Sequence, residues 1–398
     1  MEMEEVYVVA ACRTPIGKMG GALKSLNVAD LSTIVFKEIL KRGNITADMV
    51  DEIVMGETRP YAGIHNVARH AALQAGFPVT TTGFTVQQAC ASGMVAIQTS
   101  VNKIMVGMAD IVIAGGVESM SNAPFFTNNI RYGCGTGHLT VYDSITESQV
   151  GAQPASIYGR LGMGTTAETV AKEYGITRQE QDHLAHQSQL RYQAAYEAGK
   201  FDEIVPVTIT PRKGDPIVVD KDEHPRLTSE EKLASLKPVF QDDGTVTVGN
   251  ACGRNDGAAV VLLMSGKKVK ELGVKPMAKI IGYSTAGVDP TVMGIGPVPA
   301  VRKVMDKLGM TIDQFDLIEL NEAFAAQVCA CVKELGIDTD KLNVNGGAIA
   351  LGHPAGCTGG RLVGTLCYEL QRRPDAKYGL ATLCVGGGFG SAIVVEKV

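Results

Sequence analysis

The sequence contains no tryptophan, few other aromatic residues and no long hydrophobic run. Its longest aliphatic stretches, such as residues 258–264, are far shorter than the roughly 20 apolar residues that a membrane-spanning helix needs. Lysine and arginine (37 residues) are slightly outnumbered by aspartate and glutamate (42 residues), and neither a basic block nor an aromatic RNA-binding motif is present. We therefore expect neither a membrane partner nor a nucleic-acid partner.

Targeting signals and disulfide patterns are also missing from the sequence. The first residues, MEMEEVYVVA, lack the basic segment of a signal peptide, and the last, SAIVVEKV, lack a peroxisomal tripeptide. We therefore expect a cytoplasmic protein, in which the nine cysteines stay reduced. The sequence has no C-x-x-C pair and predicts no metal site. Most of the cysteines are expected to pack as small apolar side chains: Cys12, Cys134, Cys329, Cys331, Cys357 and Cys367.

Glycine, in contrast, is abundant, at 46 of 398 residues. It follows no G-X-Y period and forms no low-complexity run, which excludes collagen and flexible linkers. No G-x-G-x-x-G follows a strand in the pattern of a dinucleotide site. The length suggests two or three domain-sized units. The glycines therefore indicate a folded chain in which backbone segments approach one another or a ligand closely.

Two pairs of segments recur in the same order along the chain. Residues 45–57 (ITADMVDEIVMGE) and 310–322 (MTIDQFDLIELNE) are identical at five of thirteen positions. Residues 109–119 (ADIVIAGGVES) and 378–391 (YGLATLCVGGGFGS) each combine an apolar strand with glycines. Together the two pairs indicate a duplicated half.

Strand-like and helical segments alternate within each half, which predicts an α/β fold with largely parallel pairing. We divide the chain into an N-terminal half (1–120), a middle segment (121–275) and a C-terminal half (276–398). The middle segment combines an insertion, expected to form loops over 121–163 and two helices over 165–199, with a return to the N-terminal half. An insertion of this length is typical of a substrate-binding element.

Four motifs carry groups suited to chemistry. Cys90, in QQACASGM, lies where a strand-like run meets a helix, and a helix N-terminus would favour its thiolate. His353 lies among seven glycines in residues 343–364. Asn321, in NEAFA, ends a predicted strand, where it is either a ligand contact or a helix cap. Cys384 ends another strand, and Gly386 after it can offer a backbone N–H to an oxyanion.

In order and spacing these motifs resemble the thiolase family, and most closely its biosynthetic acetyl-CoA acetyltransferases. The resemblance extends from CRTPIG (12–17) through CASGM, GGVESMS, GNACGRNDGA, NEAFA and GHP to CVGGGFG. It implies the thiolase fold, in which two duplicated halves pack as αβαβα layers with an inserted loop domain. It also implies an enzyme that condenses two acetyl-CoA molecules reversibly to acetoacetyl-CoA and CoA. No cofactor beyond these substrates is implied.

The resemblance also implies roles for the motif residues. Cys90 would carry the acyl group, and His353 would take its proton and help to bind the thioester oxygen. Asn321 would hold a water in that oxyanion hole, and Cys384 would exchange a proton with the α-carbon of acetyl-CoA. The backbone N–H groups of Cys90 and Gly386 would form a second oxyanion hole. Claisen chemistry needs such a separate nucleophile and base.

Further residues match the substrate contacts of the family. Arg226 would lie near the nucleotide of CoA, Met163 and Met293 would line a short acyl pocket, and Phe324 would pack beside the reactive groups. Residues 121–145 would support a homotetramer, a dimer of dimers. The sequence departs from the family pattern in three places, with Cys252 for a serine that faces the pantetheine arm, Arg254 for a leucine-like residue and Gly162 for a histidine.

Three alternatives stay open. A degradative 3-ketoacyl-CoA thiolase would act on longer chains. A ketoacyl-carrier-protein synthase would share the architecture. It would have one reactive cysteine with two histidines, or with a histidine and an asparagine, and not the second cysteine that this chain has at Cys384. A non-catalytic member of the fold would bind acyl-CoA or act as a scaffold, although the four reactive side chains argue against this.

Overall fold

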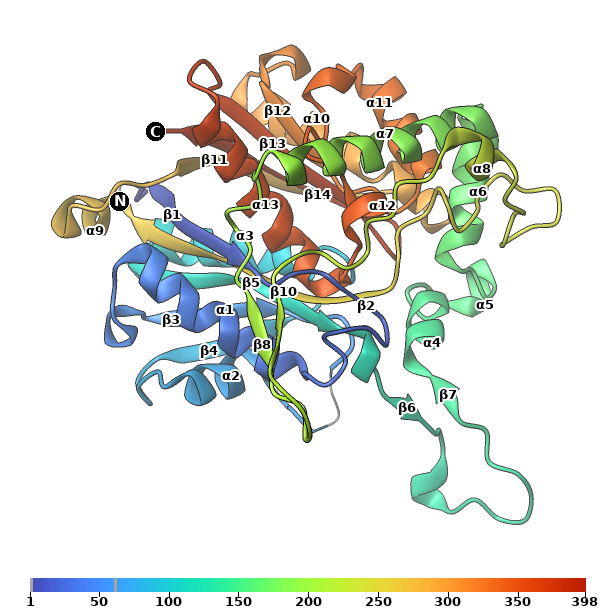
Figure 1. The fold of residues 1–398 in the computed structure, drawn as a ribbon, viewed down its shortest axis with the longest axis horizontal. Coiled ribbons are helices and arrows are strands. Elements are labelled where there is room, and N and C mark those ends of the chain that lie inside the picture. Colours follow the sequence, from blue (N-terminus) through green and yellow to red (C-terminus); the bar gives the residue numbers. More distant parts are fainter. Residues whose placement is uncertain (1–2, 61–62) are drawn as a thin grey trace.

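The computed structural model describes residues 3–60 and 63–398 and is built around a ten-stranded sheet (Figure 1). One half of the sheet has the strand order β1 (Val6–Arg13), β10 (Asn255–Ser265), β5 (Ile111–Ser119), β3 (Glu52–Gly56) and β4 (Thr82–Val86). The other half has the order β11 (Ala278–Gly287), β14 (Phe389–Lys397), β13 (Tyr378–Val385) and β12 (Leu317–Leu320). A short strand, β2 (Gly17–Lys18), pairs with β10.

The two halves share their strand directions as well as their order. In the first, β10 is antiparallel to both neighbours, and β3 is parallel to β5 and β4. In the second, β14 is antiparallel to both neighbours, and β12 is parallel to β13. The repeated segments of the sequence thus form equivalent strands, β3 with β12 and β5 with β13. The predicted duplication is confirmed, and a short antiparallel pairing of β1 with β11 joins the halves. The expectation of largely parallel pairing is wrong, because β10 and β14 run against their neighbours and antiparallel pairs outnumber parallel ones among the described strands.

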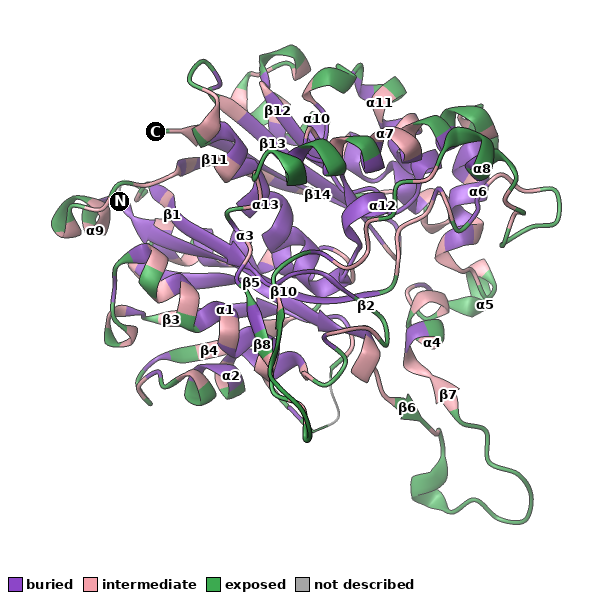
Figure 2. Ribbon diagram, in the orientation of Figure 1, coloured by how far each residue is buried: buried purple, intermediate pink, exposed green. Residues whose placement is uncertain are grey.

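The helices complete five layers, as predicted. Helices α1 (Val28–Gly43) and α2 (Val67–Ala75) pack on the outer face of the N-terminal half, and α10 (Pro297–Leu308) and α11 (Ala325–Leu335) cover the C-terminal half. Between the two halves of the sheet lie α3 (Ser92–Met105) and α13 (Ala355–Arg372). Figure 2 shows these two central helices and the strands around them as the buried part of the molecule.

Alternation along each strand decides which layer a side chain enters. On β10, Leu262 packs toward α1 and α2, whereas Leu263 packs toward the central helices. On β14, Ile393 packs toward the central helices and Val394 toward α10 and α11. Because both faces of these strands are covered, their central residues, 258–264 and 392–395, form continuous apolar runs rather than alternating with polar residues.

Glycines allow the central helices to approach at their N-terminal ends. A Cβ atom at Gly359 of α13 would lie 2.1 Å from the backbone nitrogen of Met94 on α3. A Cβ at Gly93 of α3 would lie 2.5 Å from the carbonyl oxygen of Gly356. Side chains at these positions would force the helices apart. Part of the glycine excess therefore serves the contact between the segments that carry Cys90 and His353.

The insertion runs beside the site and then returns to the sheet. It begins with an arm containing β6 (Phe125–Phe126) and β7 (Tyr142–Asp143), followed by two short helices, α4 (Ser144–Val150) and α5 (Ala155–Tyr158). The two helices expected over 165–199 are α6 (Met163–Glu173) and α7 (Arg178–Glu197). A hairpin of β8 (Val207–Ile209) and β9 (Ile217–Val219) and the short helix α8 (Glu230–Ala234) lead to β10. Two further short helices are α9 (Gly266–Leu272) and α12 (Ala348–Leu351).

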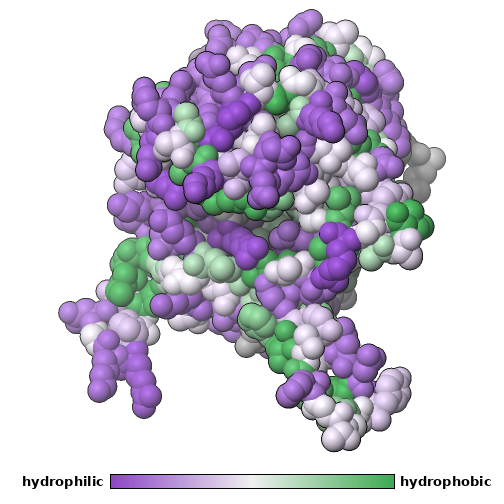
Figure 3. Space-filling model, turned by 90° about the vertical axis from the view of Figure 1, so that its right-hand side faces the viewer, coloured by the Kyte–Doolittle hydropathy of each residue, from purple (hydrophilic) through white to green (hydrophobic). Residues whose placement is uncertain are grey.

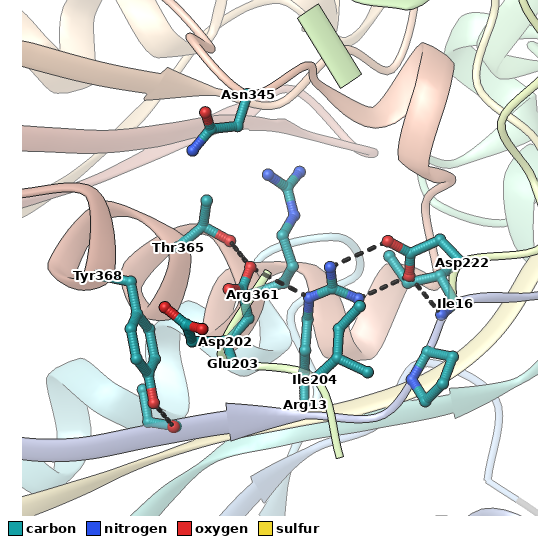
Figure 4. Close-up of polar contacts among 12 residues, drawn as sticks. Arg13, Ile16, Asp202, Glu203, Ile204, Asp222, Asn345, Arg361, Thr365 and Tyr368 are labelled. Carbon is teal, nitrogen blue, oxygen red and sulfur yellow. Dashed lines mark hydrogen bonds and ion pairs between the residues drawn. The ribbon is translucent and has the colours of Figure 1, made fainter. Parts of the chain in front are cut away.

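Buried charges attach the insertion to both halves (Figure 4). The guanidinium of Arg13 on β1 donates two hydrogen bonds, of 2.6 and 3.0 Å, to the carboxylate of Asp222. It also forms a 3.5 Å ion pair with Glu203, which accepts a hydrogen bond from Thr365 on α13. Removing one partner would leave a buried charge unpaired, at a cost of about 3–5 kcal/mol. The segments around Glu203 and Asp222 are therefore held against the sheet.

Two general expectations can be compared with the structure. In the described residues, no helix is long and apolar enough to cross a membrane. All nine cysteines are free thiols. The expectation that six of them pack as apolar side chains is wrong for Cys134, which is exposed, whereas Cys329 is half-buried and packs against the core of the C-terminal half. Cys134 lies at the tip of the arm, outside any core.

Candidate active site

The carboxyl ends of the parallel strands surround a cavity of about 610 Å³. The loops after β3, β4 and β5 reach it from one half, and the loops after β12 and β13 from the other. Ligands of α/β sheets bind at such strand ends, because the chain there leaves the sheet and exposes its side chains and amides. Four of the predicted reactive or oxyanion groups line the cavity: Cys90, His353, Cys384 and Gly386.

Cys90 lies at the tip of a tight turn between β4 and α3. The turn is closed by Ser92, whose hydroxyl donates to the carbonyl of Ala89 (2.7 Å) and accepts from the N–H of Gln88 (2.9 Å). Ala89 adopts a φ of +43°, which is strained for a residue with a Cβ. The strained residue, Ala89, directly precedes Cys90, and the turn directs the thiol of Cys90 into the cavity.

The structure contradicts the predicted preference of Cys90 for the thiolate form. Burial is the largest influence and raises the pKa of the thiol, because a charged sulfur would lose its hydration. Hydrogen bonding from the backbone N–H of Gly386 and the charge of Arg59 lower the pKa but do not cancel the burial. Helix α3 begins only at Ser92, so the thiol needs a base to become nucleophilic.

His353 has the properties of that base. Its Nδ1 lies 2.6 Å from the hydroxyl oxygen of Thr358, which itself donates to the carbonyl of Pro354 (3.0 Å). Thr358 therefore accepts a hydrogen bond from Nδ1–H of His353, which leaves a lone pair on Nε2. Burial, assisted by the charges of Arg361 and Arg59, lowers the pKa of His353 to about 3, so the imidazole is neutral. Nε2 is buried and has no hydrogen-bond partner among the described residues.

Asn321 is fully buried at the end of β12, and neither its amide oxygen nor its amide nitrogen has a hydrogen-bond partner within the described ranges. An amide with both atoms buried and unpaired is costly unless a water or a ligand satisfies it. The interpretation of Asn321 as a helix cap is wrong, because Phe324 occupies the N-cap position of α11. The unpaired amide fits the role of holding a water.

Cys384 and Gly386 provide a second reactive thiol and an amide. Cys384 is buried at the end of β13, and burial raises its pKa well above the usual value, with the nearby cysteines Cys90, Cys331 and Cys252 adding to the effect. A weakly acidic thiol gives a strongly basic thiolate, which suits proton exchange with an α-carbon. A Cβ at Gly386 would lie only 3.2 Å from the sulfur of Met163, so the absence of a side chain keeps its N–H accessible.

A buried carboxylate holds the loop that carries His353. Glu322 accepts hydrogen bonds from Ser188 (2.7 Å), from Asn343 (2.9 Å) and from the N–H of Ile349 (3.1 Å). Ser188 in turn accepts from the N–H of Gly347 (3.0 Å). Glu322 thereby connects the strand that presents Asn321 to the segment that precedes His353.

Comparison with known proteins shows which family the chain belongs to. The family description "Thiolase, N-terminal domain" matches residues 6–267, and "Thiolase, C-terminal domain" matches residues 274–397. The chain belongs to the thiolase family. It is 49% identical to the acetyl-CoA acetyltransferase of Syntrophomonas wolfei over 99% of both chains.

Two solved thiolase structures are similar over nearly their whole lengths. The acetyl-CoA acetyltransferase of Bacillus anthracis has a TM-score of 0.96 and 47% identity, with both chains fully covered. The human mitochondrial 3-ketoacyl-CoA thiolase in complex with CoA has a TM-score of 0.93 and 41% identity, covering 100% of this chain and 99% of that one. The predicted family, the thiolase fold and an acyltransferase activity are therefore confirmed.

The predicted substrate contacts of the thiolase fall into two groups. Four of them line the cavity with the reactive groups: Met163, Met293, Phe324 and Cys252. Arg226 instead lines a neighbouring, smaller cavity of about 190 Å³ together with His224. Ala251 lines both cavities, so Arg226 lies beside the site rather than in it. In the described ranges, no group of three or more His, Cys, Asp or Glu side chains is placed to hold a metal ion.

Two side chains of the thiolase cavity were missed in the sequence. Phe240 stacks edge-on against Phe324, with ring centroids 6.2 Å apart, and forms part of the wall. Arg59 follows β3 and lines the cavity on the side of Cys90. The internal repeat could have pointed to Arg59. Since Glu57 aligns with Glu322, Arg59 aligns with Phe324, which was itself a predicted substrate contact. Phe240 lies in an irregular segment without such a signal.

Proposed function

We propose that this thiolase is an acetyl-CoA C-acetyltransferase that interconverts two acetyl-CoA molecules with acetoacetyl-CoA and CoA. The observation that carries the proposal is the shared cavity of Cys90, His353 and Cys384, with the unpaired amide of Asn321 buried at the end of β12. The similar proteins from Syntrophomonas wolfei and Bacillus anthracis, both named acetyl-CoA acetyltransferase, support the choice of substrate.

In the first half-reaction Nε2 of His353 accepts the proton of Cys90 as the sulfur attacks the thioester carbon of acetyl-CoA. The imidazolium keeps this proton and donates a hydrogen bond to the thioester oxygen, while the departing CoA sulfur takes the proton of Cys384, which becomes a thiolate. The backbone N–H groups of Cys90 and Gly386 bind the oxyanion of the tetrahedral intermediate. CoA leaves, and the acetyl group remains on Cys90.

In the second half-reaction Cys384 removes a proton from the α-carbon of another acetyl-CoA. Its enolate oxygen is stabilised by His353 and by a water that Asn321 holds. The carbanion attacks the acetyl group on Cys90, and the released thiolate recovers a proton through His353. Thiolysis of acetoacetyl-CoA runs through the same steps in reverse.

A kinetic experiment tests this mechanism directly. A ping-pong enzyme exchanges label between CoA and acetyl-CoA in the absence of a second acyl substrate. We expect this exchange in the wild-type protein and in Cys384→Ala, and its loss in Cys90→Ala. Exchange that requires acetoacetyl-CoA would contradict an acyl-enzyme intermediate.

A longer-chain 3-ketoacyl-CoA thiolase is the second candidate, favoured by the similarity to the human mitochondrial enzyme. The side chains of Met163 and Met293 occupy the cavity wall and favour a short acyl group. Thiolysis rates with acetoacetyl-CoA and with ketoacyl-CoA of eight to ten carbons decide between the two.

The proposed assembly is a homotetramer, and the proposed location is the cytoplasm. The arm projects from the body of the molecule with exposed apolar side chains, as Figure 3 shows for this side: Phe125, Ile130, Tyr132, Leu139 and Val141. Such a projection is stabilised when it packs against another copy. Nine free cysteines, two of them proposed catalysts, suit a reducing compartment.

A further inference from the structure

One cation in the cavity has no part in the proposed reaction. Arg59 lines the cavity with Cys90, and its side chain is 10% exposed. Nη1 donates to the hydroxyl of Thr58 (2.8 Å) and lies 3.7 Å from the carboxylate of Glu118. Nε is buried and has no hydrogen-bond partner among the described residues.

Among the described residues, the hydrogen bond and the ion pair of Arg59 both use Nη1. A guanidinium has five N–H donors in a planar fork, and the Nη1 edge faces Thr58 and Glu118. Glu118 is itself held by the hydroxyl of Thr58 and by the N–H of Gly356, at 2.9 Å from the latter. The network fixes the position of the guanidinium while leaving Nε unsatisfied.

Arg59 is paired with Glu118, and the described lining of the cavity offers it no second acidic side chain. Among the described residues that line the cavity there is no aspartate or glutamate, whereas Arg59 and Arg254 both line it. Arg254 is exposed and lies near Asp143, whose pKa it helps to lower, so its charge is partly balanced. The charge of Arg59 reaches the reactive centre, since it lowers the pKa of both Cys90 and His353.

We propose that Arg59 binds a carboxylate at the far end of the acyl group, so that the enzyme cleaves 3-oxoacyl-CoA thioesters of dicarboxylic acids in preference to neutral ones of equal length. This inference rests on the proposed thiolase reaction. A carboxylate matches the planar fork of a guanidinium, and a hydrogen bond between two charged groups is shorter and stronger than a neutral one. The acyl group bound to Cys90 would share the cavity with Arg59.

The reaction balances without a further reactant. The sulfur of Cys90 bonds to the C3 carbonyl carbon, and the C2–C3 bond breaks. Its electron pair stays on C2, which Cys384 protonates, and acetyl-CoA leaves. The thiol of CoA then attacks the acyl-Cys90, which releases a dicarboxylic acyl-CoA with its distal carboxylate unchanged.

The test compares kcat/KM for thiolysis of 3-oxoadipyl-CoA, 3-oxopimelyl-CoA and 3-oxosuberyl-CoA with that of neutral 3-oxoacyl-CoA of matched length. We expect at least one dicarboxylic substrate to be cleaved about tenfold or more faster than its neutral counterpart, the size of one charged hydrogen bond. The effect is expected in KM as well as kcat, because the carboxylate is bound in the ground state too. If no dicarboxylic substrate exceeds its neutral counterpart, the inference is wrong.

Variants show whether Arg59 causes the preference. Arg59→Met is expected to abolish it and Arg59→Lys to retain part of it, whereas Arg302→Leu, at an exposed arginine of α10, keeps the wild-type ratio. If Arg59→Met fails to fold because Glu118 loses its cation, the wild-type ratios and Arg59→Lys still decide. A preference that survives in Arg59→Met assigns it to another residue and refutes the proposal. Absence of any acetoacetyl-CoA thiolysis would instead refute the proposed function.

Discussion

Replacing Gly359 by alanine tests whether the contact between the two central helices positions the reactive groups. The added methyl carbon would lie 2.1 Å from the backbone nitrogen of Met94, while ordinary contacts of a Cβ begin at 3.4 Å. The difference of about 1.3 Å must be absorbed by movement of α3 relative to α13, since the obstructing atom is backbone. Cys90 precedes α3 by two residues and His353 precedes α13 by two.

Gly359→Ala should change both the free energy of unfolding, through two opposing effects, and kcat/KM. Overpacking costs about 1–3 kcal/mol, and alanine in place of glycine in a helix returns about 1 kcal/mol. The free energy of unfolding should therefore fall by no more than about 2 kcal/mol. A shift of about 1 Å between Cys90 and His353 should lower kcat/KM by about 100-fold.

Gly364→Ala is the matched control on the same helix. A Cβ there would lie 3.3 Å from the methyl group of Ala11, a side-chain contact that a few tenths of an ångström relieve. It should keep wild-type activity and gain stability. The assays are thiolysis of acetoacetyl-CoA and denaturant unfolding. A Gly359→Ala protein with the activity of the Gly364→Ala control would refute the reasoning that this helix contact positions the site.

Three further predictions concern single side chains. Glu322→Gln replaces a carboxylate, which only accepts hydrogen bonds, by an amide with a donor group, so one of the contacts to Ser188, Asn343 or Ile349 is lost. We expect kcat to fall about tenfold, a larger change than the rise in KM for CoA. An unchanged kcat would contradict a positioning role. His353 is neutral in the folded protein, with a pKa of about 3, but titrates near 6.5 in the unfolded chain, so protonation favours the unfolded state. The free energy of unfolding should therefore fall as the pH drops below 6.5, by at most about 1.4 kcal/mol per pH unit. His353→Gln should flatten this slope in unfolding curves measured between pH 7 and 5. Cys252→Ser should lower KM for CoA, because a hydroxyl is a stronger hydrogen-bond partner than a thiol; an unchanged KM would show that Cys252 does not contact CoA.

The sequence was sufficient to predict the duplicated halves because β3 and β12 retain identical residues at equivalent positions. It was also sufficient to find three side chains that share the cavity, Cys90, His353 and Cys384, since each lies in a glycine-rich or strand-ending motif. The protonation state of Cys90 could not be predicted, because it depends on how completely the folded chain excludes water from the thiol. The location of Arg226 depends on how an irregular insertion folds back, which local patterns do not encode.

Arg59 shows how a tertiary arrangement decides the meaning of a residue. In the sequence it is one arginine after a short strand, and charged residues at strand ends are common. Only the fold shows that Glu118 and Thr58 hold one edge of it, and that it lines the cavity with Cys90. In the aligned repeat Arg59 corresponds to Phe324, so the charge of Arg59 has no counterpart in the other half.

The central claim is that Cys90 carries the acyl group while Cys384 acts as the separate base. Mass spectrometry of peptides from protein quenched in acid after incubation with acetyl-CoA measures this most directly. We predict one acetyl group, on Cys90, in the wild-type protein and in Cys384→Ala, and none in Cys90→Ala. Acetylation of Cys384 or of another residue in place of Cys90, or its persistence in Cys90→Ala, would contradict the account.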